Sequence, residues 1–201
     1  FFAMNVSLTA IHGLDFRFNK PDTDFKAYVM FAQCEALSVI TDEIKYPKKV
    51  GGDFSSWMMF NFCKSLGADL DIEFPEEVGG YVDCRNMFGS CANLENVSIV
   101  FPEEVGGDFI IDNMFGWCEA LLEVFLRCPE ARVGGRFSGQ YMFSSTYNDA
   151  SNSVMNVRMR FTGDVLGDFT VMWMFNNSKN IGSLEMELPG LVQGDLDFSY
   201  F

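Results

Sequence analysis

One motif recurs along the chain and constrains its fold more than any other feature. The string Met-Phe-x-x-Cys-x-x-Leu begins at Met30, Met59, Met87 and Met114. Shorter copies include Met142-Phe143 and Met174-Phe175, and an opening copy starts the chain. The anchoring Phe residues recur at intervals of 27 to 32 residues, at positions 2, 31, 60, 88, 115, 143 and 175. A period of this length predicts a solenoid, in which each repeat is one rung that buries its apolar face against the next.

A second marker keeps the same phase as the motif. Val-Gly-Gly occurs at 50–52, 78–80, 105–107 and 133–135, and its second Gly always precedes the anchoring Phe by eight residues. Gly194 would place another anchor one position past the last residue, and the chain does not begin with Met. We therefore expect a single solenoid domain over residues 1–201, with about seven rungs of about 28 residues, that belongs to a longer array.

Alternation of apolar and polar residues predicts the strands of each rung. Segments such as 70–74 and 97–101 alternate with period two and end at a Pro, as half-buried strands do. We expect Gly-Gly to form the next turn because Gly tolerates positive φ. A second short segment follows, with Phe25, Phe54, Phe109, Phe137 and Phe169 at one position. The predicted fold class is a β-rich solenoid with two short parallel sheets, in which Cys-x-x-Leu forms a tight helical turn.

The repeat resembles the BspA-like leucine-rich repeat of surface proteins from bacteria and some protists. Members of that family carry a Met-Phe-x-x-Cys-x-x-Leu core followed by a strand, and the resemblance covers nearly the whole chain. The sequence Val-Gly-Gly-Asp-Phe, as at 105–109, stands where Asp-Thr-Ser-Asn-Val-type strings are usual in the family. The resemblance implies a leucine-rich-repeat solenoid, secretion or surface display, and a role in adhesion or host contact.

Charge and hydropathy exclude two classes of partner. The net charge of −14 disfavours nucleic acid, whose phosphates must be neutralised by Lys and Arg. No stretch approaches 18 uncharged apolar residues, so the sequence predicts no membrane span. The expected partner is a protein or glycan on a host or neighbouring cell, as the family resemblance implies.

The cysteines of the motif invite a metal or redox interpretation. Cys34, Cys63, Cys91 and Cys118 share one position, which is Thr146 and Ser178 in later rungs. Zinc ligation would not tolerate these exchanges, because zinc requires thiolate, imidazole or carboxylate ligands. We expect a column of buried structural thiols, with disulfides between rungs as the open alternative. The sequence predicts no metal site and no cofactor.

Catalytic chemistry finds little support in the sequence. A nucleophile needs a positioned base, and the only histidine, His12, has no evident partner. We expect a protein that is not an enzyme. Two interpretations of the acidic turns at 76–77 and 103–104 remain open, because their oxygens suit Ca²⁺ while Lys48-Lys49 would compensate their charge.

Outward positions of the first strand are the ones whose identity the repeat leaves free. In the middle rungs they carry Phe125, Arg127, Arg158 and Arg160, and aromatic and Arg side chains are enriched in binding hot spots. We predict that these four residues form the centre of a partner-binding surface. The alternative is a solvated face of mixed charge. An insertion at 147–153 has the composition of a surface loop, and either binding or neutral drift would explain it.

Two functions from different classes are compatible with these patterns. The first is a secreted or surface-displayed recognition or adhesion module that binds a protein or glycan through outward strand residues. The second is a structural spacer or assembly component of a larger envelope, particle or phage appendage.

Overall fold

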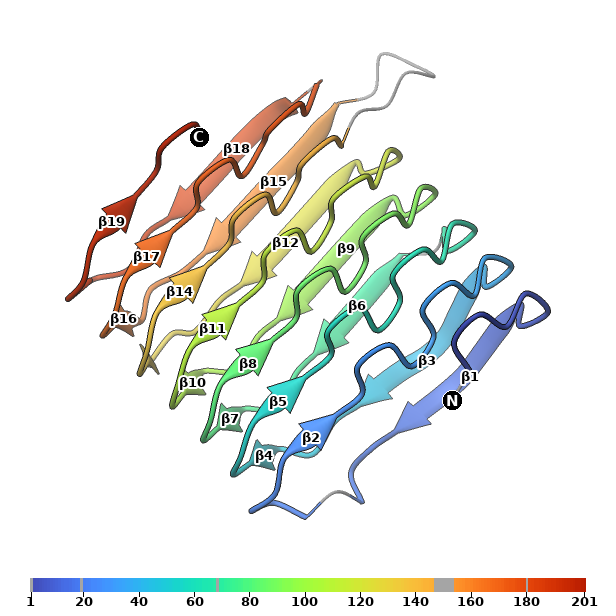
Figure 1. Ribbon diagram of the computed structural model, residues 1–201, viewed down its shortest axis with the longest axis horizontal. Coiled ribbons are helices and arrows are strands. Elements are labelled where there is room, and N and C mark those ends of the chain that lie inside the picture. Colours follow the sequence, from blue (N-terminus) through green and yellow to red (C-terminus); the bar gives the residue numbers. More distant parts are fainter. Residues whose placement is uncertain (1, 19, 68, 147–153, 180) are drawn as a thin grey trace.

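The chain folds as a β-solenoid of about six parallel turns, with about 28 residues per rung (Figure 1). This computed structural model describes residues 2–18, 20–67, 69–146, 154–179 and 181–201. Every pair of described strands is parallel and joins equivalent segments of neighbouring rungs, as in Val97↔Val124 and Phe109↔Phe137. The solenoid architecture predicted from the repeat is confirmed. Its continuation into a longer array stays a prediction.

The longest strand of each rung carries the alternating sequence. These strands form a two-stranded and a five-stranded parallel sheet along one side of the solenoid. They are β1 (Ala10–Asp15) and β3 (Val39–Lys45) in the first sheet, and β6 (Leu70–Glu73), β9 (Asn96–Val100), β12 (Glu123–Arg127), β15 (Met155–Arg160) and β18 (Ile181–Glu187) in the second.

Two further ladders of short strands complete the rungs. The five-stranded ladder precedes the Gly-Gly corner and comprises β4 (Lys49–Val50), β7 (Glu77–Val78), β10 (Glu104–Val105), β13 (Arg132–Val133) and β16 (Asp164–Val165). The seven-stranded ladder follows that corner and comprises β2 (Phe25–Lys26), β5 (Phe54–Ser55), β8 (Val82–Asp83), β11 (Phe109–Ile110), β14 (Phe137–Ser138), β17 (Phe169–Thr170) and β19 (Leu196–Asp197).

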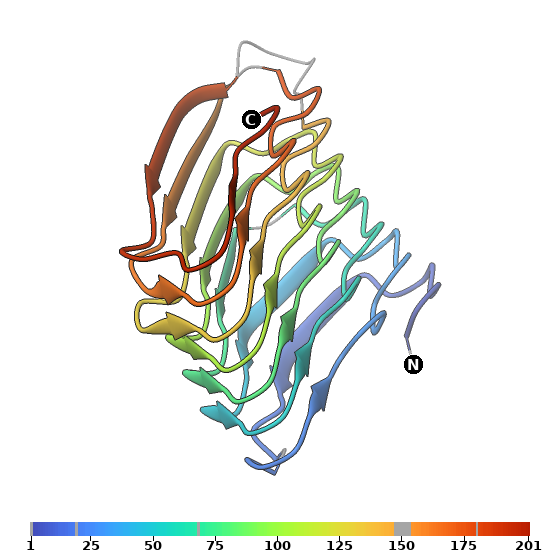
Figure 2. The same cartoon turned by 60° about the vertical axis from the view of Figure 1, so that its left-hand side comes forward.

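A complete rung therefore has three strands, where the sequence predicted two. The strands just before Gly-Gly are only two residues long, too short for alternation to reveal them. Figure 2 shows the long strands on one side of the solenoid and the β2–β19 ladder on the other. The apolar core lies between them.

The segment that contains the Met-Phe-x-x-Cys-x-x-Leu motif has no helix in the described residues, so the predicted helical turn is wrong. Successive β-turns replace it: the Met59 N–H donates to Ser56 O at 3.0 Å and the Cys63 N–H to Phe60 O at 3.1 Å. The third residue of each of these turns has positive φ, 54° at Met58 and 60° at Phe62. The same two positions have positive φ throughout the solenoid, at Met4, Val29, Gln33, Met58, Phe62, Asn86, Ser90, Asn113, Trp117, Tyr141, Ser145, Trp173, Asn177 and Tyr200.

Hydrogen bonds between rungs explain why bulky residues accept this conformation. The Phe60 N–H donates to Met87 O at 2.9 Å, and the Phe62 N–H donates to Gly89 O at 2.8 Å. The ladder thus continues through the turns and holds each rung in the backbone conformation of its neighbour. A left-handed residue costs about 1–2 kcal/mol, and such residues persist where the surrounding structure over-determines them.

The Gly-Gly corner requires glycine for a reason other than the predicted positive φ. Among the described glycines, only Gly13 has positive φ. Adjacent corners instead stack so closely that a Cβ on Gly106 would lie 2.1 Å from Gly79 O, and one on Gly134 would lie 2.2 Å from Gly106 O. Any side chain would push the rungs apart.

Stacked rings fill the core. The anchoring Phe rings of successive rungs lie 5.3–5.8 Å apart, with interplanar angles of at most 15°. These separations lie in the favourable range for aromatic pairs. Rings of the second column, such as Phe54, contact a third column that includes Tyr46 and Phe74. Identical residues stacked in register bury a core that no single rung could form.

The third column of rings accounts for the position of Cys128, which lies outside the repeated motif. The Cys128 N–H donates to Arg160 O at 2.8 Å, and the Phe101 N–H donates to Arg127 O at 2.9 Å, so Cys128 takes the place of a ring between Phe101 and Phe161. Beside it the rings of Phe109 and Phe137 are tilted by 52°. We attribute the tilt to the room left by the smaller thiol.

The motif cysteines donate hydrogen bonds along the solenoid. Cys63 Sγ lies 3.2 Å from Phe31 O and Cys118 Sγ lies 3.0 Å from Phe88 O, in each case on the preceding rung. Ser178 donates its hydroxyl to Phe143 O in the same way. The position therefore selects a small donor, and all six thiols are free and buried. The predicted column of structural thiols is confirmed.

Replacing Gly106 with Ala should destabilise the solenoid by about 1–3 kcal/mol or more, because overpacked cores show costs of this size and the clash here is with backbone. Thermal unfolding followed by circular dichroism would measure the change. Gly190→Ala is the matched control, since the nearest atom to its added Cβ would be 3.5 Å away. Equal melting temperatures for the two variants would contradict the close stacking of the corners.

The buried thiols should not react with a thiol reagent in the folded protein at pH 8. Burial raises the pKa of Cys63 and of Cys118 from 9.0 to about 12, so the nucleophilic thiolate is scarce. For the same reason, the stability linked to these thiols is complete below pH 9 and is lost as the pH rises from 9 towards 12. Labelling with an aromatic disulfide should modify all six cysteines only after denaturation. Rapid labelling of any motif cysteine under native conditions would refute this.

Candidate binding face

The four residues predicted to bind a partner lie next to one another on β12 and β15. Alternation along each strand turns Val124 and Leu126 into the core and their neighbours outward. The strands pair so that Phe125 lies opposite Arg158 and Arg127 opposite Arg160. The predicted cluster is thus one patch on the outer face of the long-strand sheet.

Each arginine of this patch pairs with a glutamate of the same chain. Arg127 Nε lies 2.9 Å from Glu130 Oε1, and Arg160 Nε lies 2.9 Å from Glu187 Oε2. Arg158 pairs with Glu185 across β15 and β18. The Arg127 guanidinium holds the pKa of the Glu130 carboxyl below its usual range. The patch is therefore of mixed charge and not a cationic surface.

A shallow groove with a volume of about 920 Å³ runs across this sheet from β6 to β18. Phe125 and Arg158 line it, together with a row of polar side chains that crosses the strands. In that row the Asn156 amide donates to Glu123 at 2.8 Å, and the Ser183 hydroxyl donates to Asn156 at 2.8 Å. Polar groups held by neighbouring rungs, with one aromatic ring among them, can fix the orientation of a polar ligand.

The first rung departs from the register expected from the repeat. Counting the same distance from the anchoring Phe aligns Asp15 with Ile44, but β1 and β3 place Asp15 opposite Lys45. A register shift between His12 and Leu14 accounts for the difference. His12 Nδ1 lies 2.6 Å from Thr41 Oγ1.

The acidic turns are compensated by cations of adjacent rungs. Lys48 Nζ lies 2.7 Å from Glu76, Lys49 Nζ lies 2.7 Å from Glu77, and Arg132 pairs with Glu104. Within the described ranges, no group of three His, Cys, Asp or Glu could hold a metal ion. The insertion at 147–153 lies outside the described residues.

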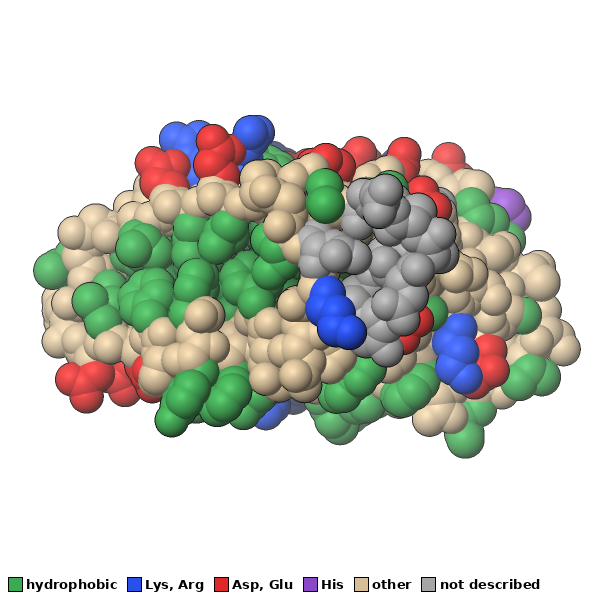
Figure 3. All heavy atoms as spheres, turned by 90° about the horizontal axis from the view of Figure 1, so that it is seen from above, with side chains coloured by type: hydrophobic (Ala, Val, Ile, Leu, Met, Phe, Trp, Pro, Cys, Tyr) green, Lys and Arg blue, Asp and Glu red, His purple; other side chains and the backbone are tan. Residues whose placement is uncertain are grey.

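The opposite side of the solenoid carries exposed aromatic residues that the sequence analysis missed. Figure 3 shows charged side chains along one long side, and hydrophobic side chains with a few charged ones between them along the other. The three tryptophans, Trp57, Trp117 and Trp173, all lie within three residues of an anchoring Phe. Trp57 and Trp117 are exposed, and Trp173 stacks on Tyr200 with ring centroids 4.1 Å apart. The available signal was tryptophan at motif positions that several other rungs fill with polar residues, such as Arg85, Ser90 and Asn113.

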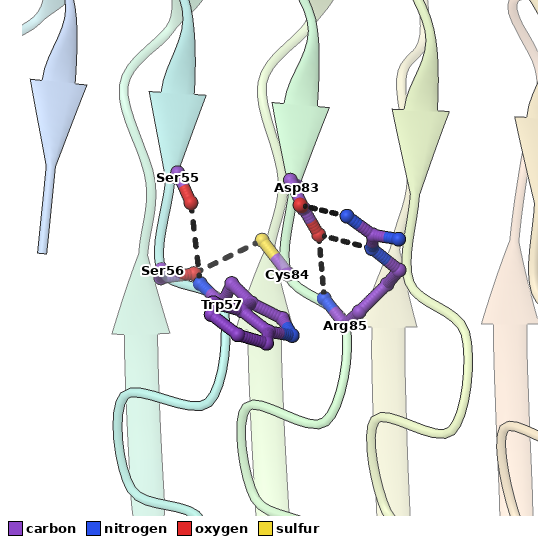
Figure 4. Close-up of polar contacts among 6 residues, drawn as sticks. All are labelled: Ser55, Ser56, Trp57, Asp83, Cys84 and Arg85. Atoms are coloured by element: carbon purple, nitrogen blue, oxygen red, sulfur yellow. Dashed lines mark hydrogen bonds and ion pairs between the residues drawn. The ribbon is translucent and has the colours of Figure 1, made fainter. Parts of the chain in front are cut away.

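An ion pair with a nearly buried carboxylate joins Asp83, in β8 of the β2–β19 ladder, to Arg85 just after it (Figure 4). Arg85 donates from Nε and Nη2 to the two oxygens of Asp83, at 2.8 and 2.6 Å, and its N–H donates to the same carboxylate at 3.1 Å. The Asp83 side chain is 10% exposed. This carboxylate raises the pKa of Arg85. In the neighbouring rung, Ser56 donates to Cys84 Sγ at 3.2 Å.

No family model, no curated protein and no solved structure matches this chain.

Asp83→Asn should destabilise the protein by about 1.5–3 kcal/mol, because hydrogen bonds to charged groups contribute about this much. Glu35→Gln is the control, since Glu35 and Lys64 form an exposed pair at 2.9 Å and such pairs contribute less than about 1 kcal/mol. Thermal melting of both variants at neutral pH would rank them. A larger loss for Glu35→Gln would show that the Asp83 pair does not stabilise this face.

Proposed function

We propose that the chain is a recognition or adhesion module that binds a protein or glycan through the groove of the long-strand sheet. The observation that carries this proposal is the groove itself, about 920 Å³ in volume and lined by outward residues whose identity the repeat leaves free. Solenoids commonly use such extended surfaces for partners. Phe125 and Arg158 contribute the aromatic and planar charged groups that are enriched in hot spots.

The composition of the groove favours a polar partner. Because Glu185 pairs with Arg158 and Glu187 pairs with Arg160, a ligand must match alternating charges and hydroxyl or amide groups. The resemblance of the repeat to BspA-like leucine-rich repeats supports secretion or surface display. In the part of the chain that the structure describes, no helix is long and apolar enough to cross a membrane.

The alternative from another class is a structural spacer or assembly component. The intrachain pairing of Arg127, Arg158 and Arg160 favours it, because a face whose charges are already compensated needs no partner. In a spacer, only the core columns and the stacking of the rungs would matter.

The two functions separate in a binding experiment. The folded chain would be passed over immobilised matrix proteins and over acidic and neutral glycans, beside the variant Phe125→Ser/Arg158→Gln. We expect at least tenfold weaker binding by this variant, with an unchanged melting temperature. The control, Trp57→Ser/Lys26→Gln, removes one aromatic and one cation that do not line the groove and should bind like the parent. Absence of binding by the parent, or equal binding by the first variant, would favour the spacer.

A further inference from the structure

A second groove lies in the turn segments, away from the long-strand sheet. Its volume is about 470 Å³, and it spans three successive rungs. Phe62 lines it on the first of these rungs, Ser90 on the middle one and Trp117 on the third. All three occupy the same position of the repeat, two residues after the anchoring Phe, and have φ near 60°.

The arrangement of large and small side chains gives this groove the shape of a slot. Phe62 and Trp117 are two rungs apart, roughly 9.6 Å at a strand spacing of ~4.8 Å. The middle rung lines the groove with Asn86, Gly89, Ser90 and Ala92, none of which is aromatic. A ring placed midway would lie about 5 Å from each wall, within the range of favourable ring contacts.

Local packing leaves no room for a side chain at two glycines of these rungs. A Cβ on Gly89 would lie 2.6 Å from the Asn61 amide nitrogen, and one on Gly116 would lie 2.2 Å from Asn113 Oδ1. The Asn61 amide donates to Gly89 O at 3.0 Å. Asn61 is itself buried and lines the groove, and its Oδ1 has no hydrogen-bond partner among the described residues.

Among the described residues, the slot offers two free donor groups beside two free acceptors, Asn61 Oδ1 and the Glu119 carboxylate. Within the described residues, neither the Trp117 indole N–H nor the Asn86 amide nitrogen makes a hydrogen bond, whereas Asn86 Oδ1 accepts from Asn113 at 2.5 Å. Proline has no N–H, so a proline-rich segment presents carbonyl acceptors that need such donors. A Lys or Arg in the same segment would supply the donor that the Glu119 carboxylate accepts.

The charge around the slot favours a cationic ligand. Glu119 lines the groove, and the ammonium of Lys64 is engaged by Glu35 on the preceding rung at 2.9 Å. The whole chain carries a net charge of −14. A cationic ligand is therefore attracted at long range and finds a carboxylate beside the slot.

We propose that this groove binds a proline-rich peptide in the polyproline II conformation, with Lys or Arg next to the prolines. Such peptides dock into aromatic-lined grooves, where their preformed helix lowers the entropic cost of binding. One polyproline II turn spans about 9 Å, close to the two-rung separation of Phe62 and Trp117. The site is separate from the long-strand groove.

The test uses a decaproline peptide with lysine at each end, titrated while tryptophan fluorescence and calorimetric heat are recorded. Ser90→Phe should fill the slot and weaken binding at least tenfold. The repeat accepts this change, because Phe62 already occupies the equivalent position with the same φ. Gln33→Phe adds the same side chain on the rung before Phe62, outside the slot, and should bind like the parent.

Three results of the peptide titrations would overturn the proposal. They are no binding by the parent, equal binding of a Gly-Ser peptide of the same charge, and unchanged affinity in Ser90→Phe. Binding of a neutral hexasaccharide in place of the peptide, lost in Ser90→Phe, would assign the slot to a glycan and also overturn it. The variant Phe125→Ser/Arg158→Gln should keep full peptide affinity, so failure at one groove is distinguishable from failure at the other.

Discussion

The backbone hydrogen bonds between rungs are the constraint on which the rest of this molecule depends. They do not stop where the strands end, because Phe60 and Phe62 donate to the next rung from within the turn segment. A ladder that runs through the turns requires the same backbone conformation in every rung. Bulky residues such as Trp117 therefore adopt positive φ, at a local cost that the many shared hydrogen bonds offset.

The repeated backbone explains the columns of side chains. Because equivalent residues lie directly above one another, the anchoring Phe rings stack nearly parallel, and each motif thiol meets the carbonyl of the anchor one rung earlier. The same geometry brings the Gly-Gly corners so close that no Cβ fits between them. A column tolerates an exchange when its neighbours can adapt. Ser178 replaces a motif cysteine because it also donates to the carbonyl of the preceding anchor, and Cys128 replaces a ring because the rings beside it tilt.

The side chains whose identity the ladder does not constrain are the ones available to contact a partner. On the long-strand sheet these are polar and charged groups paired across rungs, and in the turn segments they are exposed aromatic residues. A regular scaffold thus presents two surfaces of different chemistry. The long-strand sheet carries paired charges and polar groups, and the slot between Phe62 and Trp117 is walled by aromatic rings.

The sequence by itself determined the solenoid, its period, the outward placement of Phe125 and Arg158, and the buried role of the motif cysteines, because these follow from periodicity alone. Only the tertiary structure decided the conformation of the turns, since Met58 and Phe62 carry no local preference for positive φ and acquire it from the ladder. It also decided that the corner glycines are required by the close stacking of the rungs, and that the arginines of β12 and β15 pair with glutamates. Both depend on distances between rungs, which no single repeat encodes.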